Sequence, residues 1–317
     1  MTAPLIALTG ATGFIGRHLL RELPHRGYRV RVLLRRPSEV PPEASSAVIG
    51  DIASPQNMAN ALRGVDAIIH SAGLAHAMSG LPEDDYRAIN TEATVGLARA
   101  AERSGIRRFV FLSSIRAQSG PTAAGILTED DAPNPTDAYG RSKLAAEEGL
   151  ASVGIDWVAL RPVLVYGPGV KGNMAALLSL AGSALPLPLG GLRAKRSVLA
   201  VENLAGAVDA VLAAPGPIRR PFIVADPEPV TVAEIVAALR AGLGRSPGLL
   251  PVPAGLLALA ARLAGREEQF ARLAGSLVAS PAALMRLGWR PAVATREALA
   301  RLARETGALP PAPRPGA

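Results

Sequence analysis

The stretch "LIALTGATGFIG" (Leu5–Gly16) joins a short apolar run to three regularly spaced glycines. Glycine lets the backbone turn sharply and approach a pyrophosphate closely. When a strand precedes such a turn and a helix follows it, the free N–H groups and the positive dipole end of the helix face the phosphates. We therefore predict a strand at Leu5–Thr9, a helix from about Ile15, and a dinucleotide-binding turn between them. Glycines outside this context would indicate only a tight turn.

Strand and helix patterns continue to alternate through the first half of the chain. Further short apolar runs lie at Arg29–Leu34, Ala47–Gly50, Val65–Gly73, Arg107–Ser114 and Ile155–Pro162. Strands that are separated by helices pair in parallel through right-handed crossovers. Because runs such as "FVFL" are apolar on both sides, helices are expected to cover both faces of the sheet. The predicted fold class is α/β: a Rossmann-like, doubly wound parallel sheet with a smaller, mainly helical C-terminal substrate domain.

The domain boundaries are expected where this alternation stops and proline and glycine become frequent. Residues 1–170 are predicted to form the NAD(P)-binding domain. Residues 197–225, with a strand, a helix and another strand, are predicted to return to that domain. The segments 171–196 and 226–308 would form the substrate-binding part. The proline-rich end, 309–317, is expected to be a disordered tail.

The composition argues against several classes of protein. The chain has no cysteine, so disulfides, a thiolate nucleophile and a thiolate metal site are excluded. The four histidines lack the spacing of metal ligands, and no metal site is expected. The formal net charge is +8, but the cations are spread along the chain and aromatic residues are only 3%. A nucleic-acid partner is therefore not expected, although a basic cleft would suit a small anion such as a nucleotide.

No targeting or membrane segment is expected from the sequence. The start "MTAPLIALTG" lacks a basic leader. None of the apolar stretches reaches about 20 residues without charge or proline. We therefore expect a cytoplasmic protein without membrane insertion.

The end of the second predicted strand bears on the choice of dinucleotide. A carboxylate at that place would bind the ribose hydroxyls and indicate NAD. The chain has Arg35 and Arg36 there, and guanidinium groups pair well with phosphate. The sequence thus favours NADP(H), and NAD(H) remains possible if both arginines are only solvated. After the third strand, Asp51 and Ile52 could flank the adenine, or Asp51 could simply be a turn residue.

The segment "YGRSK" places Tyr139 and Lys143 four residues apart. On a helix these positions share a face, so both side chains could point at one ligand. A free phenol has a pKa near 10, and a nearby ammonium is expected to lower the pKa of Tyr139. The pair suits proton transfer during a redox reaction, although two solvated residues on a helix surface would show the same spacing.

Taken together, "TGATGFIG", "GD", "HSAG", "FLSS", "YGRSK" and "LRPVLVYGPG" resemble the extended short-chain dehydrogenase/reductase family in order and spacing. The resemblance covers nearly the whole chain. The second half is similar to the nucleotide-sugar epimerase/dehydratase branch, and within it to enzymes that act at C4 of UDP-N-acetylhexosamines. Those enzymes include 4-ketoreductases that form UDP-N-acetylquinovosamine, and 4-epimerases.

The resemblance implies a role for particular residues. Tyr139 would be the acid/base, Lys143 would contact the ribose, and Ser114 would hydrogen-bond the reacting substrate oxygen, with Ser113 as its rival. Asn173 and Arg196 would bind the substrate diphosphate. The implied cofactor contacts are Gly10, Thr12, Gly13, Phe14, Ile15, Gly16, Arg35, Arg36, Asp51, Ile52, Ser71, Ala72, Gly73, Tyr139, Lys143 and Pro162.

A few other residues are informative by comparison with the same branch. Asn90 would support the catalytic elements, and Asn203 is expected to cap the helix that follows it. His76 could approach the sugar, but a structural role is expected. Ile115 and Arg116 stand where dehydratases need an acidic pair, so 4,6-dehydration is not expected.

The function expected from the sequence is NADP(H)-dependent reduction of a C4 ketone. The substrate would be a nucleotide sugar of the UDP-4-keto-6-deoxy-N-acetylhexosamine type, in surface polysaccharide biosynthesis. The main alternative is an NAD-dependent UDP-sugar 4-epimerase. Two further alternatives are a reductase of a non-sugar ketone and a non-catalytic dinucleotide-binding protein. The resemblance also implies a homodimer.

Overall fold

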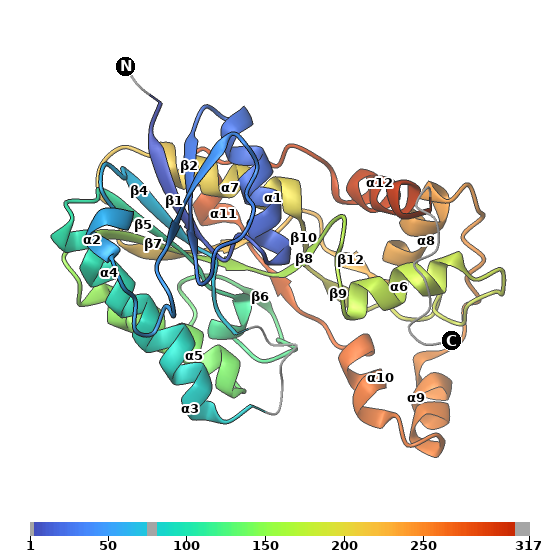
Figure 1. Ribbon diagram of the computed structural model, residues 1–317. Coiled ribbons are helices and arrows are strands. Elements are labelled where there is room, and N and C mark those ends of the chain that lie inside the picture. Colours follow the sequence, from blue (N-terminus) through green and yellow to red (C-terminus); the bar gives the residue numbers. More distant parts are fainter. Residues whose placement is uncertain (1–2, 75–80, 308–317) are drawn as a thin grey trace, which may run out of the picture.

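The computed structural model describes residues 3–74 and 81–307. Its centre is a seven-stranded parallel sheet in the order β11-β7-β5-β4-β1-β2-β3 (Figure 1). The strands are β1 (Leu5–Thr9), β2 (Arg29–Leu34), β3 (Ala44–Val48), β4 (Ala67–His70), β5 (Arg108–Leu112), β7 (Asp156–Pro162) and β11 (Arg220–Val224). The predicted parallel sheet is confirmed. The third strand begins three residues earlier than expected and ends at Val48, because it continues to pair with β2 through Ala44.

The sheet is buried on both faces, as its continuous apolar strands require. In β1, Ile6 and Leu8 pack in one hydrophobic cluster and Leu5 and Ala7 in another. The first cluster includes residues of α1 (Phe14–His25) and α7 (Val201–Ala213). The second includes residues of α4 (Ala93–Arg103) and α5 (Ala138–Ala151). Figure 1 shows these two helical layers on opposite sides of the strands.

The order of the strands reverses beside β1. From β1 the chain adds β2 and β3 on one side, and β4, β5, β7 and β11 on the other. At such a switch point, the loops at the carboxyl ends of the strands part and leave a crevice that binds ligands. The glycine turn, Arg35, Ser71 and Ser114 all follow the carboxyl ends of strands, so the sequence directs them to this edge.

Shorter elements separate the main ones. They are α2 (Met58–Ala61), α3 (Glu83–Tyr86), a π-helical turn (Arg87–Glu92), a 3₁₀ turn (Ile115–Ala117) and the paired strands β6 (Ile126–Leu127) and β13 (Val278–Ala279). The helical segment from Glu83 to Arg103 therefore contains a π turn between α3 and α4. Such turns insert one extra residue and are frequent at functional sites.

The C-terminal half contributes a third hydrophobic cluster. It is formed by α6 (Asn173–Gly182), α8 (Val232–Gly242) and α12 (Thr295–Gly307), with strands β8 (Leu164–Tyr166), β10 (Val198–Ala200), β9 (Lys195–Arg196) and β12 (Val230–Thr231) nearby. Helix α11 (Ala282–Arg286) packs beside β11. Figure 1 shows α9 (Ala254–Leu263) and α10 (Glu267–Ala274) projecting beyond this part. The predicted domain boundaries themselves stay a prediction.

The expected helix cap at Asn203 is wrong. Helix α7 begins at Val201, so Asn203 lies inside its first turn. Its buried amide oxygen accepts from the backbone N–H of Ala292 at 2.7 Å, and its Nδ2 donates to Asp226 at 2.8 Å. The polar side chain is committed to a tertiary contact with a distant segment, which a local capping pattern cannot reveal.

No helix within 3–74 or 81–307 has the length and apolar character needed to cross a bilayer.

Candidate active site

The glycine turn forms as predicted at the carboxyl end of β1. Gly10 has a φ of +71°, and a Cβ on it would lie 2.6 Å from the backbone of Ser71 and Ala72. A Cβ on Gly16 would lie 2.0 Å from the carbonyl oxygen of Gly10. The turn therefore packs directly against the end of β4 and against the start of α1. Only glycine fits at Gly10 and Gly16, because no side chain has room there.

A cavity of about 600 Å³ lies between this turn and the ends of β2, β3 and β4. Its wall contains eight of the predicted cofactor contacts, namely Gly10, Thr12, Arg35, Arg36, Asp51, Ile52, Ala72 and Gly73. The remaining predicted contacts lie outside that wall: Gly13, Phe14, Ile15, Gly16, Ser71, Tyr139, Lys143 and Pro162. The cavity therefore lies at the edge of the sheet where this kind of fold binds dinucleotides, and the individual cofactor contacts stay a prediction.

Arg35 and Asp51 form an ion pair across this cavity, with 3.3 Å between their charged atoms. Asp51 also accepts a hydrogen bond from the backbone N–H of Ala53 at 3.0 Å. Asp51 therefore has the turn role that was one of its two alternatives. Its contact with adenine stays a prediction.

Ser114 and Tyr139 meet where the end of β5 faces the start of α5. Asp137 caps α5 by accepting from Gly140 N–H at 2.7 Å, which places Tyr139 in the first helical turn. The Ser114 Oγ accepts from the backbone N–H of Arg116 at 3.1 Å. Ser114 also forms a hydrogen bond with the phenol of Tyr139. The contact with Ser114 lowers the pKa of the phenol, which is the effect of a hydrogen bond that favours the phenolate.

Ser113 is committed to a different partner. Its buried hydroxyl donates to Glu147, which in turn pairs with Arg161 inside the protein. This network lies behind the strand end and keeps the Ser113 hydroxyl from the phenol of Tyr139. The geometry therefore favours Ser114 over Ser113 as the partner of a reacting oxygen.

Lys143 lies one helical turn after Tyr139 and is buried. Its Nζ donates to the carbonyl oxygen of Leu112 at 2.9 Å and lies 6.0 Å from the ring centroid of Tyr139. Burial lowers the pKa of Lys143 to about 8, although the carboxylate of Glu147 acts in the opposite direction. The side chain therefore remains mainly cationic at neutral pH.

The pKa of Tyr139 differs from the expectation. Burial raises it above its ordinary value, and the carboxylate of Asp137 adds to the rise, while the hydrogen bond with Ser114 and the charge of Arg116 act in the opposite direction. The expected lowering by the Lys143 ammonium is therefore wrong for this structure. Loss of water around the phenol outweighs the favourable charges nearby.

Asn90 connects the π turn to the catalytic helix. Its buried Oδ1 accepts from Leu74 N–H at 2.8 Å, and its Nδ2 donates to Ser142 Oγ at 3.0 Å. A Cβ on Gly73 would lie 2.7 Å from that Oδ1 and 3.5 Å from Lys143 Nζ. Asn90 thus packs the segment after β4 against α5, as the family resemblance implied.

His70 was not singled out from the sequence, yet it lies at the centre of this region. It is fully buried between the hydroxyls of Thr9 at 2.7 Å and Thr94 at 3.0 Å. Since Thr94 donates to the carbonyl of Asn90, the ring must donate to Thr94 from Nε2 and accept from Thr9 at Nδ1. Burial lowers the pKa of His70 to about 3, so the ring is neutral. A lone histidine at a strand end carries no sequence signal for this role.

The two predicted diphosphate ligands lie apart from the cofactor cavity. Asn173 is the exposed first residue of α6. Arg196, in β9, donates from Nη2 to the carbonyls of Arg272, Leu273 and Gly275, all within 3.0 Å. Arg196 therefore holds the C-terminal end of α10, and its role towards a substrate stays a prediction. His76 lies outside the described residues.

Arg116 stands beside the catalytic pair. Its guanidinium pairs with Asp137, the cap of α5. The position that would carry an acid in a dehydratase therefore carries a cation near Tyr139. Among the described residues, no cluster of three or more histidine, aspartate or glutamate side chains is arranged to hold a metal ion.

Comparison with known proteins identifies the family. Residues 6–225 match the model of the NAD dependent epimerase/dehydratase family. The chain is 34% identical over 298 residues to UDP-glucose 4-epimerase of Vibrio cholerae, which covers 90% of each chain. Among solved structures, MoeE5 in complex with UDP-glucose and NAD has a TM-score of 0.71 and 28% identity, covering 95% of this chain and 98% of MoeE5.

The fold is also shared with UDP-N-acetylglucosamine 4-epimerase from Bacillus cereus. That structure has a TM-score of 0.77 and 23% identity, and it covers 95% of this chain and 98% of its own. The chain therefore belongs to the NAD dependent epimerase/dehydratase family and is an NAD(P)-dependent oxidoreductase or epimerase.

Proposed function

We propose that the protein is a UDP-sugar 4-epimerase, which inverts the configuration at C4 of the sugar. The observation that carries this proposal is the hydrogen-bonded pair of Ser114 and Tyr139 beside the buried Lys143. The 34% identity to a relative named UDP-glucose 4-epimerase, over 90% of both chains, supports it. This relative is the reason to prefer the epimerase to the 4-ketoreductase.

The residues around the cavity fit a dinucleotide. The glycine turn lies directly before α1, whose free N–H groups can bind a pyrophosphate. Glycine at positions 10 and 16 permits this tight turn, because a Cβ there would meet the backbone of Ser71, Ala72 or Gly10. Among the described residues, Lys143 Nζ donates to one acceptor, the carbonyl oxygen of Leu112. An ammonium has three donors, so two remain for ribose hydroxyls.

Proton transfer at the substrate would be the task of Tyr139. When bound, the nicotinamide would supply an acceptor and donor of hydride for C4 of the sugar. Tyr139, as a phenolate, would take the proton of the sugar C4 hydroxyl when the sugar is oxidised at C4, with the oxidised nicotinamide as hydride acceptor. Tyr139 would give the proton back to the C4 oxygen when the opposite face of the sugar is reduced, which yields the epimer. Ser114 would donate a hydrogen bond to the same oxygen and stabilise its developing charge.

The raised pKa of Tyr139 shows what else the reaction needs. A buried phenol loses its proton easily only when positive charge lies close to it. Lys143 and Arg116 are the cations near this phenol. We infer that these charges, together with that of an oxidised nicotinamide, must act jointly to offset the effect of burial.

Arg196 is proposed as a contact for the substrate diphosphate because no carboxylate in the described part of the chain compensates its charge. It forms no ion pair within the described part of the chain, and its Nε is buried without a hydrogen-bond partner. A diphosphate oxygen would satisfy that N–H and supply the missing counter-charge. Asn173 is proposed as a second contact on the family resemblance alone.

The second candidate is an NADP(H)-dependent 4-ketoreductase. It is favoured by one observation: Arg35 and Arg36 line the cofactor cavity where an acid would indicate NAD. We keep NADP(H) as the proposed cofactor preference, while the MoeE5 structure holds NAD. A homodimer, a cytoplasmic location and the two-part domain organisation also remain proposals.

One assay separates the two functions. The purified protein is incubated with UDP-N-acetylglucosamine or UDP-glucose. NAD or NADP is added only in substoichiometric amount, and the products are identified by NMR. An epimerase produces the C4 epimer of the UDP-sugar without net consumption of the nicotinamide cofactor. Stoichiometric loss of NADPH absorbance with a 4-keto-6-deoxy UDP-sugar, and no epimer from the first two sugars, would favour the reductase. Inactivity in both assays contradicts both proposals.

A further inference from the structure

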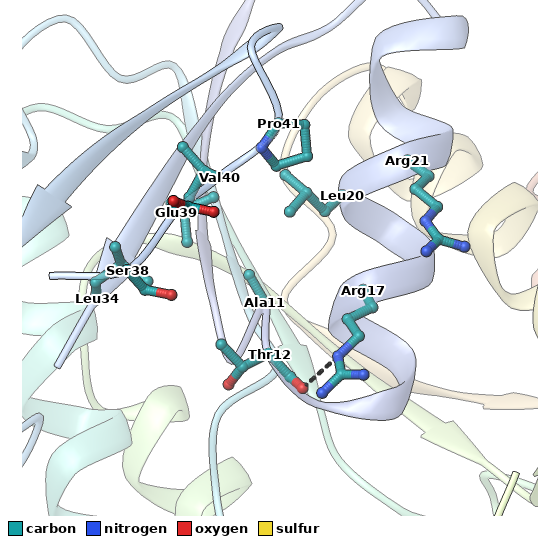
Figure 2. A pocket seen from close by; sticks show the side chains of 11 residues that line it. Ala11, Thr12, Arg17, Leu20, Arg21, Leu34, Ser38, Glu39, Val40 and Pro41 are labelled. Atoms are coloured by element: carbon teal, nitrogen blue, oxygen red, sulfur yellow. Dashed lines mark hydrogen bonds between the residues drawn. The ribbon is translucent and has the colours of Figure 1, made fainter. Parts of the chain in front are cut away.

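A second, smaller cavity of about 230 Å³ adjoins the cofactor cavity (Figure 2). It lies between α1 and the loop after β2, with Ser38 and Val40 on the loop side. Both cavities have a shared set of lining residues, namely Ala11, Thr12, Leu34 and Ser38. These residues form a neck through which a group bound in the larger cavity can extend into the smaller one.

The smaller cavity has a basic wall. Arg17 and Arg21 line it from successive turns of α1. Neither forms an ion pair within the described part of the chain, and both are exposed. Arg17 Nε donates to the carbonyl oxygen of Thr12 at 2.8 Å, which holds its guanidinium at the glycine turn (Figure 2). Figure 2 shows Arg21 farther along the helix and Glu39 on the loop across from Arg17.

The neck coincides with the expected position of the adenosine ribose. In this kind of fold the ribose lies between the glycine turn and the end of the second strand. The neck is made of the turn residues Ala11 and Thr12 on one side, and of Leu34 and Ser38 after β2 on the other. A substituent on the ribose 2′ oxygen would therefore point into the smaller cavity.

Arg35 is not available in the same way. Its guanidinium pairs with Asp51, and it lines the larger cavity but not the smaller one. The positive charge closest to the neck on the helix side is therefore Arg17. An exposed guanidinium that is held by one backbone acceptor keeps its other N–H groups for a phosphate.

We propose that the smaller cavity receives the 2′-phosphate of NADP(H), and that Arg17 is the residue that selects the phosphorylated ribose, with Ser38 as a hydroxyl donor. The inference rests on the proposed use of a dinucleotide in the larger cavity. It assigns cofactor selection to a helix residue, in addition to the arginines that follow β2.

The test compares two small probes that differ only in the 2′-phosphate. Adenosine 2′,5′-diphosphate and 5′-AMP are titrated into the intact protein by calorimetry, for wild type, Arg17→Gln and Arg17→Lys. Wild type is expected to bind the 2′-phosphorylated probe about tenfold more tightly. Arg17→Gln should lose most of that preference and leave the affinity for 5′-AMP unchanged, while Arg17→Lys should keep part of it. The matched control is Arg103→Gln, an exposed arginine of α4, which should keep the full preference.

The proposal is overturned if wild type binds both probes equally. It is also overturned if Arg17→Gln keeps the preference, or weakens both probes alike, since the latter result would mark a purely structural role at the turn. These measurements need no sugar substrate. Loss of UDP-sugar conversion with an intact probe preference would therefore contradict the proposed function and leave this inference standing.

Discussion

Ser113 and Ser114 are neighbours in sequence, but their hydroxyls serve different parts of the structure. Ser114 bonds to the phenol of Tyr139, whereas Ser113 donates to the buried Glu147. Successive residues of an extended chain point to opposite sides, so only one of the pair can face the crevice. The family pattern favoured Ser114, and the contacts supply the physical reason.

Substituting each serine should separate chemistry from stability. Ser114→Ala is expected to lower kcat by about 100-fold, because it removes a donor to the reacting oxygen. Ser113→Ala should leave kcat within a few-fold and reduce the free energy of unfolding by about 1–3 kcal/mol, since Glu147 loses a buried donor. Steady-state kinetics and urea denaturation measure the two effects. Equal losses of kcat in both variants would contradict the assignment.

The buried Lys143 should make stability depend on pH. Its pKa is about 8 in the folded protein, lowered by burial from 10.5. Between these values the unfolded chain binds more protons than the folded one, so the free energy of unfolding rises with pH. The contribution of Lys143 should grow by about 2 kcal/mol between pH 7.5 and 9.5. The raised pKa of Tyr139 acts in the opposite sense only above about pH 10, its ordinary value.

Lys143→Met, which keeps the length of the side chain, should abolish this contribution. Urea denaturation gives the free energy of unfolding of wild type and variant at pH 7.5 and 9.5. The change between the two pH values in wild type, minus the same change in the variant, is the contribution of Lys143, because the other titrating groups contribute equally to both proteins. A difference that does not change with pH would show that the lysine is not titrating in this range.

At the scale of elements, the glycine turn shows how a local pattern can require a long-range packing geometry. Gly13 N–H bonds to the carbonyl of Gly10 within the turn, at 3.0 Å. Gly16 brings the first turn of α1 against that same carbonyl oxygen, where a Cβ would lie at 2.0 Å. The three glycines are alike in the sequence, but they have unequal space in the structure.

Gly16→Ala should therefore be much more harmful than Gly13→Ala. The alanine methyl at position 16 meets rigid backbone, and we expect a loss of about 3 kcal/mol in the free energy of unfolding. At Gly13 the nearest atom would be 3.2 Å away, so the loss should be below about 1 kcal/mol. Chemical denaturation of both variants tests the difference. Similar stabilities would show that α1 shifts freely relative to the turn.

The π turn at Arg87–Glu92 is an element that the sequence pattern does not reveal. An apolar periodicity of about 3.6 residues indicates helix, but it does not show where one extra residue is inserted. Within this turn the side chain of Asn90 bonds to both Leu74 and Ser142, which are distant in sequence. The chain thereby joins the cofactor side of the crevice to α5.

For the whole molecule, Asn203 and Asp226 join segments that are distant in sequence. Asn203 bonds to the backbone of Ala292 and Val293, and Asp226 accepts from Ala200 N–H and from Asn203. Burial raises the pKa of Asp226, and its hydrogen bonds oppose that rise. This buried cluster anchors the segment before α12 to the sheet.

Asn203→Leu should remove that anchor. It would remove one of the donors to the buried carboxylate of Asp226 and the acceptor of the Ala292 and Val293 N–H groups, and we expect a loss of about 3 kcal/mol in the free energy of unfolding. Asn60→Leu is the control, because Asn60 is exposed and its one recorded side-chain bond is to the nearby Arg63. If the two variants unfold at the same urea concentration, the cluster does not stabilise the fold.

Sequence alone determined the parallel sheet, the glycine turn, and the positions of Ser114, Tyr139 and Lys143 at the carboxyl edge. These features depend on local periodicity and on the rule that parallel strands end at one edge, so short patterns encode them. The partners of Ser113, His70, Asn203 and Arg196, and the direction of the pKa shift of Tyr139, were decided only by the tertiary structure. Hydrogen-bond choice and burial depend on which distant segments pack together, and that information is not present in any short stretch of the chain.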